Sequence, residues 1–298
     1  MTEPVFHPDF GKTDRIQRQA VSPRSLGPLR FLMKLGGWLS GRGVEKAVSA
    51  TGQKIWVFRP EAAGPHPAIL WIHGGGLIFG HPLIEKPFAR DVARELGAVV
   101  ACPFYRLAPE DPYPAGLEDV YAALQWLAAQ PGVDPTRIAV GGDSAGGGLA
   151  AALTILARER GGPAIRFQLL HEPMLDEATR RAAAPDPETL RLWTPEINTW
   201  AWDGYLQDVR GPVPETASPS RIEDPAGLPA AWVGVGTRDL FHAEARDYAD
   251  RLSAAGVPVT FHDVPGGFHG FAQVRKDAAV SRAYVARMKA ALADAFKR

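Results

Sequence analysis

The sequence has very little cysteine and no excess of either charge. Cys102 is the only cysteine, so an internal disulfide is excluded, and the chain fits a reducing compartment. Its place in an apolar run favours a buried strand position over a reactive thiol. Lysine plus arginine and aspartate plus glutamate both number 33, so no net field attracts nucleic acid or an acidic membrane.

Long apolar runs are also missing. No stretch of about eighteen apolar residues occurs, which excludes a membrane-spanning helix. The chain opens on Met1-Thr2-Glu3-Pro4, with no basic region followed by an apolar run, so we expect no secretory signal and a cytoplasmic protein. There are no internal repeats and no metal-ligand spacing, and we expect no metal and no cofactor.

From about residue 45, short apolar runs alternate with segments of helical spacing. This alternation is typical of βαβ units and predicts an α/β fold, with a largely parallel sheet and helices on both faces. At this length a single domain, 1–298, can bury a large core. Seven strands are predicted, with an eighth over 44–49 left open: 54–58, 68–72, 98–101, 137–140, 166–170, 231–235 and 259–264. Helical segments are predicted over 115–130, 147–160, 243–255 and 277–296.

Two segments, 1–44 and 177–225, fall outside this rhythm. Ligands of open α/β sheets bind outside the carboxyl ends of the strands, so both segments are candidates for a cap over that edge. The apolar patch at 29–35 favours a docked cap helix over a membrane-surface helix, because only Arg30 and Lys34 are placed to face lipid headgroups. The second segment carries aromatic residues open to two interpretations, core packing or substrate lining: Trp193, Trp200, Trp202 and Tyr205.

A serine framed by glycines follows one of the predicted strands. The run Gly142-Asp143-Ser144-Ala145-Gly146 lies between the strand at 137–140 and a helical segment, which is the context that a Gly-x-Ser-x-Gly nucleophile requires. The serine takes a strained conformation, and side chains at the two glycines would collide where strand and helix meet. We therefore predict that Ser144 is a nucleophile, with the N-terminus of the helix directed at it.

A glycine-rich loop, His73-Gly74-Gly75-Gly76, directly follows the strand at 68–72. Residues without Cβ allow close approach and positive φ, so backbone N–H groups can turn toward an anionic oxygen. Together with the N–H of Ala145, such a loop would form an oxyanion hole. The two motifs, in this order and each after a strand, predict acyl-transfer chemistry.

A serine at its ordinary pKa needs a base within hydrogen-bond reach. Among eight histidines, His269 is favoured because it lies in a glycine-bracketed loop after the last strand, at the same sheet edge as Ser144. We expect His73 to hold the glycine loop in shape and His171, at a strand end, to line the pocket. The others are expected in strands, loops or helix starts: His7, His66, His81, His242 and His262.

The base in turn needs an orienting carboxylate. Asp239 is the first acid after the strand at 231–235 and is the favoured residue. Its alternative role is to cap the following helix, a common use of aspartate. Glu244 and Asp263 are weaker rivals, and Asp143 is expected to fix the serine turn by hydrogen bonds.

With these residues assembled, the chain resembles the bacterial hormone-sensitive-lipase family of α/β-hydrolase carboxylesterases. Four motifs carry the resemblance over residues 68–271: His73-Gly74-Gly75-Gly76, Tyr105-Arg106-Leu107-Ala108-Pro109-Glu110, Gly142-Asp143-Ser144-Ala145-Gly146 and His269-Gly270-Phe271. The resemblance implies an α/β-hydrolase fold with an eight-stranded, mostly parallel sheet and a helical cap from 1–44 and about 180–215. It also implies a serine nucleophile, a histidine base, an orienting aspartate and three oxyanion donors: Ser144, His269, Asp239, Gly75, Gly76 and Ala145.

This sequence departs from the family pattern at two places. The family usually has Asp-Pro-Leu around its acid, where this chain has Asp239-Leu240-Phe241. A Tyr-Pro pair commonly follows the sixth strand, where this chain has His171-Glu172-Pro173. The second change is expected to alter the polarity of the pocket and the preferred ester.

We therefore expect a serine carboxylesterase that hydrolyses short- to medium-chain acyl esters of small molecules. By analogy with the family, it would form a homodimer through edge strands. An amide- or lactone-directed hydrolase on the same scaffold stays open, because nothing in the sequence measures the leaving group. A receptor that keeps the fold without the chemistry is a second alternative, and the presence of His269 argues against it.

Overall fold

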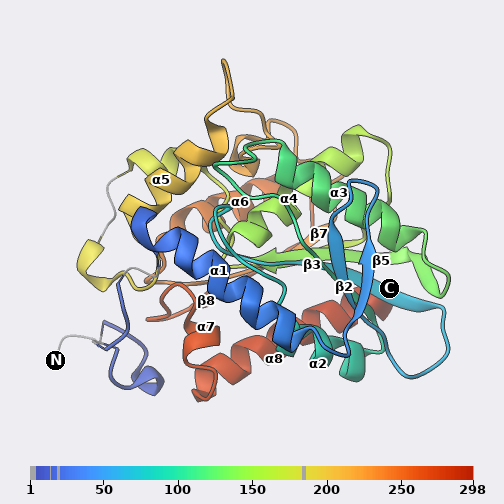
Figure 1. Ribbon diagram of the computed structural model, residues 1–298. Coiled ribbons are helices and arrows are strands. Elements are labelled where there is room, and N and C mark those ends of the chain that lie inside the picture. Colours follow the sequence, from blue (N-terminus) through green and yellow to red (C-terminus); the bar gives the residue numbers. More distant parts are fainter. Residues whose placement is uncertain (1–4, 14, 19–20, 183–185, 298) are drawn as a thin grey trace.

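A computed structural model describes residues 5–13, 15–18, 21–182 and 186–297 of the chain. Within these residues eight strands form one sheet in the order β1-β2-β4-β3-β5-β6-β7-β8 (Figure 1). The pairs β1–β2 and β2–β4 are antiparallel and all others are parallel. The strands are β1 (Glu45–Val48), β2 (Lys54–Phe58), β3 (His66–Ile72), β4 (Val99–Pro103), β5 (Val133–Asp143), β6 (Phe167–His171), β7 (Ala230–Gly236) and β8 (Val259–Val264). The predicted α/β fold is confirmed, including the strand left open at 44–49.

Helices cover both faces of the sheet. One face carries α2 (Lys86–Leu96) and α8 (Ala279–Lys297), and the other carries α3 (Ala115–Ala128), α4 (Ala145–Glu159) and α6 (His242–Ala254). The central strand β3 shows why both faces are buried. Ile69 and Trp71 pack in the core layer of α2 and α8, whereas Leu70 and Ile72 pack in the layer of α3, α4 and α6. Successive side chains of a strand point to opposite faces, so a continuous apolar run needs a cover on each.

The remaining elements lie outside the sheet: η1 (Pro8–Phe10), α1 (Pro23–Ser40), η2 (Glu177–Arg181), η3 (Pro187–Thr189), α5 (Pro195–Leu206), η4 (Pro219–Arg221) and α7 (Phe271–Val274). Helix α1 begins with a capping box, in which the Ser22 and Ser25 side chains each accept the other's backbone N–H, and Pro23 follows as a natural first residue. The two irregular segments meet where the Leu192 N–H donates to the Gln17 carbonyl at 3.0 Å.

The parallel strands β3, β5, β6, β7 and β8 all end at the same edge of the sheet. Loops that follow these five strands therefore converge, although they are far apart in the sequence. In the part of the chain that the structure describes, no helix is both long and apolar enough to span a bilayer. Residues 1–4, on which the expectation about a secretory signal rests, lie outside the described residues, as does part of each predicted cap segment.

Candidate active site

Ser144 stands at a sharp turn between β5 and α4. Its backbone angles, φ 54° and ψ −117°, are strained for a residue with a side chain. The turn is held because the Ser144 N–H donates to the His171 carbonyl at 2.8 Å. Glycine at 146 is required, since a Cβ there would lie 2.0 Å from the Ile72 carbonyl oxygen. The sequence thus forces a hydroxyl to project from a tight strand-to-helix junction.

Three polar side chains from separate loops form one hydrogen-bonded series. His269 Nε2 lies 3.0 Å from Ser144 Oγ, and His269 Nδ1 lies 2.8 Å from Asp239 Oδ2. The other oxygen of Asp239 accepts the Phe241 N–H at 2.9 Å, so this carboxylate also fixes the start of α6. Ser144 is 4% and His269 8% exposed, so the series is shielded from bulk water. The arrangement suits removal of a proton from the hydroxyl by the imidazole.

The pKa of His269 is raised from 6.5 to about 9. Burial alone lowers it, because desolvation disfavours the imidazolium. The charge of Asp239 and its hydrogen bond to the ring outweigh that effect. An imidazole in this setting is a strong base that holds a proton well once it has taken one.

The glycine loop after β3 presents backbone donors beside this series. Gly75 and Gly76 have φ of 111° and 59°, which residues with side chains rarely adopt. Among the described residues, neither N–H group has a protein hydrogen-bond acceptor. Ala145 is the first residue of α4, a position whose N–H has no acceptor within the helix. These are the three donors implied by the family resemblance.

Aromatic packing supports the loop from the other side. His73 Nδ1 donates to the Gly74 carbonyl at 2.8 Å, and the Tyr105 hydroxyl donates to the His73 carbonyl at 3.0 Å. The His73 and Tyr105 rings are stacked, with centroids 4.2 Å apart. Burial lowers the pKa of His73 to about 4, so its ring is neutral. This agrees with a role in shaping the loop, and it shows that the Tyr105 motif contacts the glycine loop although the two are far apart in the chain.

Glu172, which entered the sequence analysis only as part of a departure from the family pattern, lies next to the imidazole. This residue has φ of 45° and is fully buried. Glu172 Oε2 accepts the Gly270 N–H at 2.6 Å and lies 4.0 Å from His269 Nδ1. Burial, together with the charge of Asp239, raises the pKa of Glu172 well above its usual range. The signal in the sequence was the departure from the family pattern at His171-Glu172-Pro173.

A small apolar cavity of about 10 Å³ adjoins Ala145, and this is about the room that one water-sized group needs. Its walls come from α4, the loop after β6 and α5, and they include Leu149, Met174, Trp202 and Tyr205. Of the aromatic residues left open between two interpretations, Trp202 and Tyr205 therefore line this cavity. His171 does not, contrary to expectation: its ring is buried, with Nδ1 3.0 Å from the Tyr284 hydroxyl.

The rival acids have other partners. A Glu244 oxygen accepts the Leu175 N–H at 2.6 Å, and Asp263 contacts His242 at 2.8 Å and Arg246 at 2.6 Å. None of these contacts involves the imidazole of the candidate base. Asp143 accepts from the Gln273 side chain at 3.0 Å, so it ties the serine turn to α7 rather than bonding within the turn.

Two sets of described side chains have possible metal-ligand atoms within 4.8 Å of one another: Asp143, His171 and Glu172, and Glu172, Asp239 and His269. In the second set, both imidazole nitrogens of His269 already have hydrogen-bond partners. In the first set, both nitrogens of His171 contact neighbouring polar side chains. We therefore interpret both sets as hydrogen-bonded networks and assign no metal to them.

Comparison with known proteins gives a consistent result. Residues 69–273 match the family of the alpha/beta hydrolase fold. Carboxylesterase NlhH of Mycobacterium tuberculosis is 39% identical over 216 residues, which cover 69% of this chain and 66% of that protein. The match thus spans slightly less than two thirds of this relative. An acetyl-hydrolase of Streptomyces hygroscopicus is 34% identical over 205 residues, 67% of each chain.

Solved structures match over nearly the whole length. A bacterial heroin esterase superposes with a TM-score of 0.86 at 36% identity, covering 99% of both chains. The esterase LipW from Mycobacterium marinum superposes with a TM-score of 0.83 at 31% identity, covering 97% of this chain and 98% of the other.

Proposed function

Because the chain belongs to the α/β hydrolase-fold family, we propose that it is a serine carboxylesterase with Ser144 as nucleophile, His269 as base and Asp239 as orienting acid. The observation that carries this proposal is the series Asp239–His269–Ser144, with contacts of 2.8 and 3.0 Å. Esterase names among both relatives and solved structures support it. The same contacts argue against a receptor without chemistry, because a binding site alone needs no base beside the hydroxyl.

The reaction proceeds in two halves. His269 Nε2 takes the Ser144 proton as Oγ attacks the ester carbonyl, and the imidazolium then donates that proton to the leaving alcohol oxygen. The carbon–oxygen bond to the alcohol breaks and an acyl-serine remains. Water then gives a proton to His269 and attacks the acyl carbon, and the proton returns to Ser144 as the acid leaves. Asp239 keeps Nε2 directed at the serine and stabilises the imidazolium in both halves.

Backbone groups stabilise the tetrahedral oxyanion. We assign this role to the N–H groups of Gly75, Gly76 and Ala145, which are supported by the positive φ of the loop and by the start of α4. Donors fixed in advance in a site closed to water cost no reorganisation during the reaction, and loss of one commonly lowers kcat by about a hundredfold or more. Trp193, whose ring centroid is 6.2 Å from that of His269, helps to exclude water.

The preferred acyl group is short. The cavity beside Ala145 measures about 10 Å³, the room of about one water-sized group, and its wall is apolar, which fits the methyl end of an acetyl group better than a medium chain. The name of the Streptomyces hygroscopicus relative, an acetyl-hydrolase, supports this preference. We thus propose the short end of the range expected from the sequence.

The described parts of the segments 1–44 and about 180–215 form a cap over the site. Arg30 of α1 donates to the Ile78 and Ala108 carbonyls at 2.8 and 2.6 Å, and so fastens α1 to the loop beyond the glycines and to the loop after β4. Trp193, in the second segment, covers the glycine loop. Both segments thus restrict which esters reach Ser144.

Two further proposals concern location and assembly. A single cysteine, buried in β4 with the pKa of its thiol raised by burial, fits the reducing cytoplasm. Strand β8 is an edge of the sheet and is only partly buried, so it offers a pairing surface for a homodimer. Light scattering of the purified chain tests the second proposal directly.

The variant Ser144→Ala tests the activity. Hydrolysis of nitrophenyl acetate should fall to background, while thermal unfolding stays close to that of the unchanged protein. Ser220→Ala is the matched control. Its hydroxyl is buried like that of Ser144, but it makes no hydrogen bond in the described structure. Parallel assays with an acetanilide and with a lactone test the two alternatives, an amide-directed and a lactone-directed hydrolase. Turnover of the acetate ester that survives in Ser144→Ala removes the assignment.

A further inference from the structure

Helix α1 exposes an apolar stripe to solvent. The stripe consists of Phe31, Leu32, Leu35, Trp38 and Leu39. These side chains are between 47% and 66% exposed, and they make up five of the nine large hydrophobic residues exposed in the described part of the chain. Their spacing of i, i+1, i+4, i+7 and i+8 places them on one side of the helix, opposite the side that buries Leu26 and Gly37. A helix already docked through one face thus carries a second apolar face that the described chain leaves uncovered.

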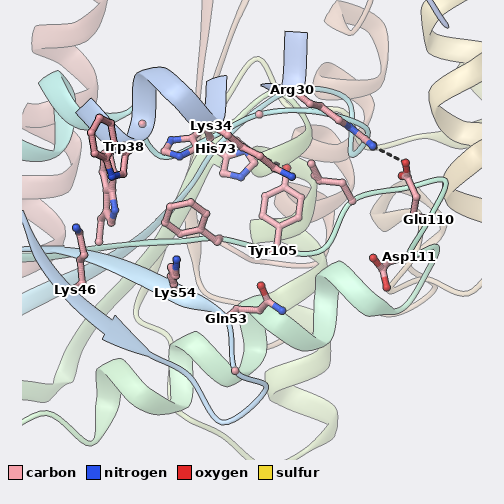
Figure 2. A pocket seen from close by; sticks show the side chains of 17 residues that line it. Arg30, Lys34, Trp38, Lys46, Gln53, Lys54, His73, Tyr105, Glu110 and Asp111 are labelled. Carbon is pink, nitrogen blue, oxygen red and sulfur yellow. Dashed lines mark hydrogen bonds and ion pairs between the residues drawn. The ribbon is translucent and has the colours of Figure 1, made fainter. Parts of the chain in front are cut away.

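A cationic cleft adjoins this stripe. It has a volume of about 780 Å³ and is bounded by α1, the β1–β2 hairpin and the loop after β4. Figure 2 shows Lys34 reaching into it from α1, with Lys46 and Lys54 contributed by the hairpin on the other side. None of the three lysines has an ion pair or hydrogen bond within the part of the chain that the structure describes. Trp38 lines the cleft and also belongs to the stripe, so the two features are continuous.

The side chains that line this cleft carry a net positive charge, even when those that form ion pairs are left out. Arg30 is paired with Glu110 at 2.7 Å, which leaves Asp111 as the other acid that lines the cleft, against three lysines. Arg42, just beyond α1, stacks on the Trp38 ring with 4.8 Å between its guanidinium carbon and the centroid, which adds a cation at the end of the stripe. A chain with no net charge therefore concentrates positive charge beside the exposed apolar stripe of α1.

We propose that this face docks the protein on an anionic lipid surface, with the stripe entering the boundary of the acyl chains and the three lysines contacting headgroup phosphates. An amphipathic helix lying in the plane of a bilayer has this combination of an apolar side and flanking cations. Negative surface potential attracts such clusters within about one Debye length. The docking is peripheral and reversible, since only one short helix contributes apolar side chains.

Charge also distinguishes this occupant from a second copy of the chain. Most homodimers are symmetric and present the same patch on both subunits. A symmetric contact through the α1 stripe would bring the lysine clusters of the two copies toward each other. A surface of opposite charge removes that repulsion. An anionic lipid surface is therefore a better partner for this face than the same face of a second copy.

Vesicle co-sedimentation of the full chain tests this proposal. Vesicles of phosphatidylcholine with phosphatidylglycerol should bind the protein, and vesicles of phosphatidylcholine alone should bind at least about tenfold more weakly. Raising the salt concentration should weaken the binding, because exposed charges are screened. The double variant Phe31→Ser with Leu35→Ser and the triple variant Lys34→Gln, Lys46→Gln, Lys54→Gln should each lose most of it.

Matched controls use exposed residues outside the face. Val274→Ser removes an apolar side chain that is 43% exposed, and Lys276→Gln removes an exposed cation; both should bind vesicles like the unchanged protein. Hydrolysis of a water-soluble acetate ester should be unchanged in the Phe31→Ser, Leu35→Ser variant, because both side chains are on the solvent side of α1, opposite the side that buries Leu26 and Gly37. A failure of docking is thereby separate from a failure of the esterase assignment.

Four results overturn the proposal. The first is equal binding of the unchanged protein to both kinds of vesicle. The second is full retention of vesicle binding in the double variant or in the triple variant. The third is a dimer, measured by sedimentation equilibrium without lipid, that dissociates in the Phe31→Ser, Leu35→Ser variant and so identifies a second copy as the occupant. The fourth is binding of inorganic phosphate that depends on the lysines while no vesicle binds.

Discussion

The indole of Trp193 lies directly against Gly76. A Cβ built at Gly76 would be 2.0 Å from a carbon of that ring, and the φ of 59° at this residue also disfavours any side chain. The indole itself is held by its N–H, which donates to Asn198 Oδ1 at 3.2 Å. One contact therefore joins the irregular segment before α5 to the loop that supplies the proposed oxyanion donors.

Replacing Gly76 by alanine should disrupt that loop. The methyl group must displace either Trp193 or the backbone, and we expect kcat/KM for a short acyl ester to fall about a hundredfold or more, as when an oxyanion donor is lost. Gly27→Ala is the control, because a Cβ at this position in α1 meets nothing within 4 Å. Unchanged kcat/KM in Gly76→Ala, measured by initial rates, would show that the loop plays no part in catalysis.

The activity should increase with pH. Attack by Ser144 needs neutral imidazole, and a His269 pKa of about 9 means that the protonated form predominates at neutral pH. We expect kcat/KM to rise about tenfold per pH unit in the acid range and to level off above about pH 9. Asp239→Asn removes the charge that raises this pKa, so its midpoint should lie at lower pH and its kcat should be much smaller. Identical midpoints in the two proteins would contradict the assigned partner.

Glu172 should act as a neutral hydrogen-bond acceptor. Burial raises the pKa of Glu172 well above its usual range, and its Oε2 accepts the Gly270 N–H next to His269. Glu172→Gln keeps an acceptor without a charge, so kcat/KM should stay close to that of the unchanged protein. Glu172→Ala leaves the partly buried Gly270 N–H without its acceptor, at a cost of up to about 1–3 kcal/mol in the free energy of unfolding, and removes a contact that holds the loop of His269. Equal loss of activity in both variants would show that an ionised carboxylate is required.

The acyl-chain preference should follow the volume beside Ala145. Leu149 lines that cavity, so Leu149→Ala should raise the rate ratio of hexanoyl to acetyl ester by about tenfold or more, within the range that a few methylenes supply. Leu153→Ala removes an equally buried leucine of α4 that does not line the cavity, and each change costs about 2–5 kcal/mol of stability. A similar shift in both variants would mean that loosening of the core, and not the cavity, sets chain length.

Much of the fold follows from local pattern. The continuous apolar run of β3 and the helical spacing of apolar residues in α3 are local patterns that predict these elements. The glycines around Ser144 predict a turn in which strand and helix come too close for a side chain. Because β5, β7 and β8 run parallel, the loops that follow them lie at one edge of the sheet. Asp239 and His269 could therefore be predicted from their places after successive strands.

Other features depend on contacts that no local pattern encodes. The closeness of Glu172 to His269 arises from the pairing of β6 with β7 and β8 beyond it. The expectation that only Arg30 and Lys34 accompany the apolar patch of α1 was incomplete, since Lys46 and Lys54 reach the same face from a hairpin.

Covalent labelling tests the central claim most directly. Treatment of the purified chain with an organophosphate, followed by mass spectrometry of its peptides, should show one modified residue, Ser144, with loss of ester hydrolysis in proportion to labelling. The His269→Ala variant should label far more slowly, because its hydroxyl lacks a base. Complete inhibition with the label on another residue, or full activity with Ser144 labelled, would contradict the account.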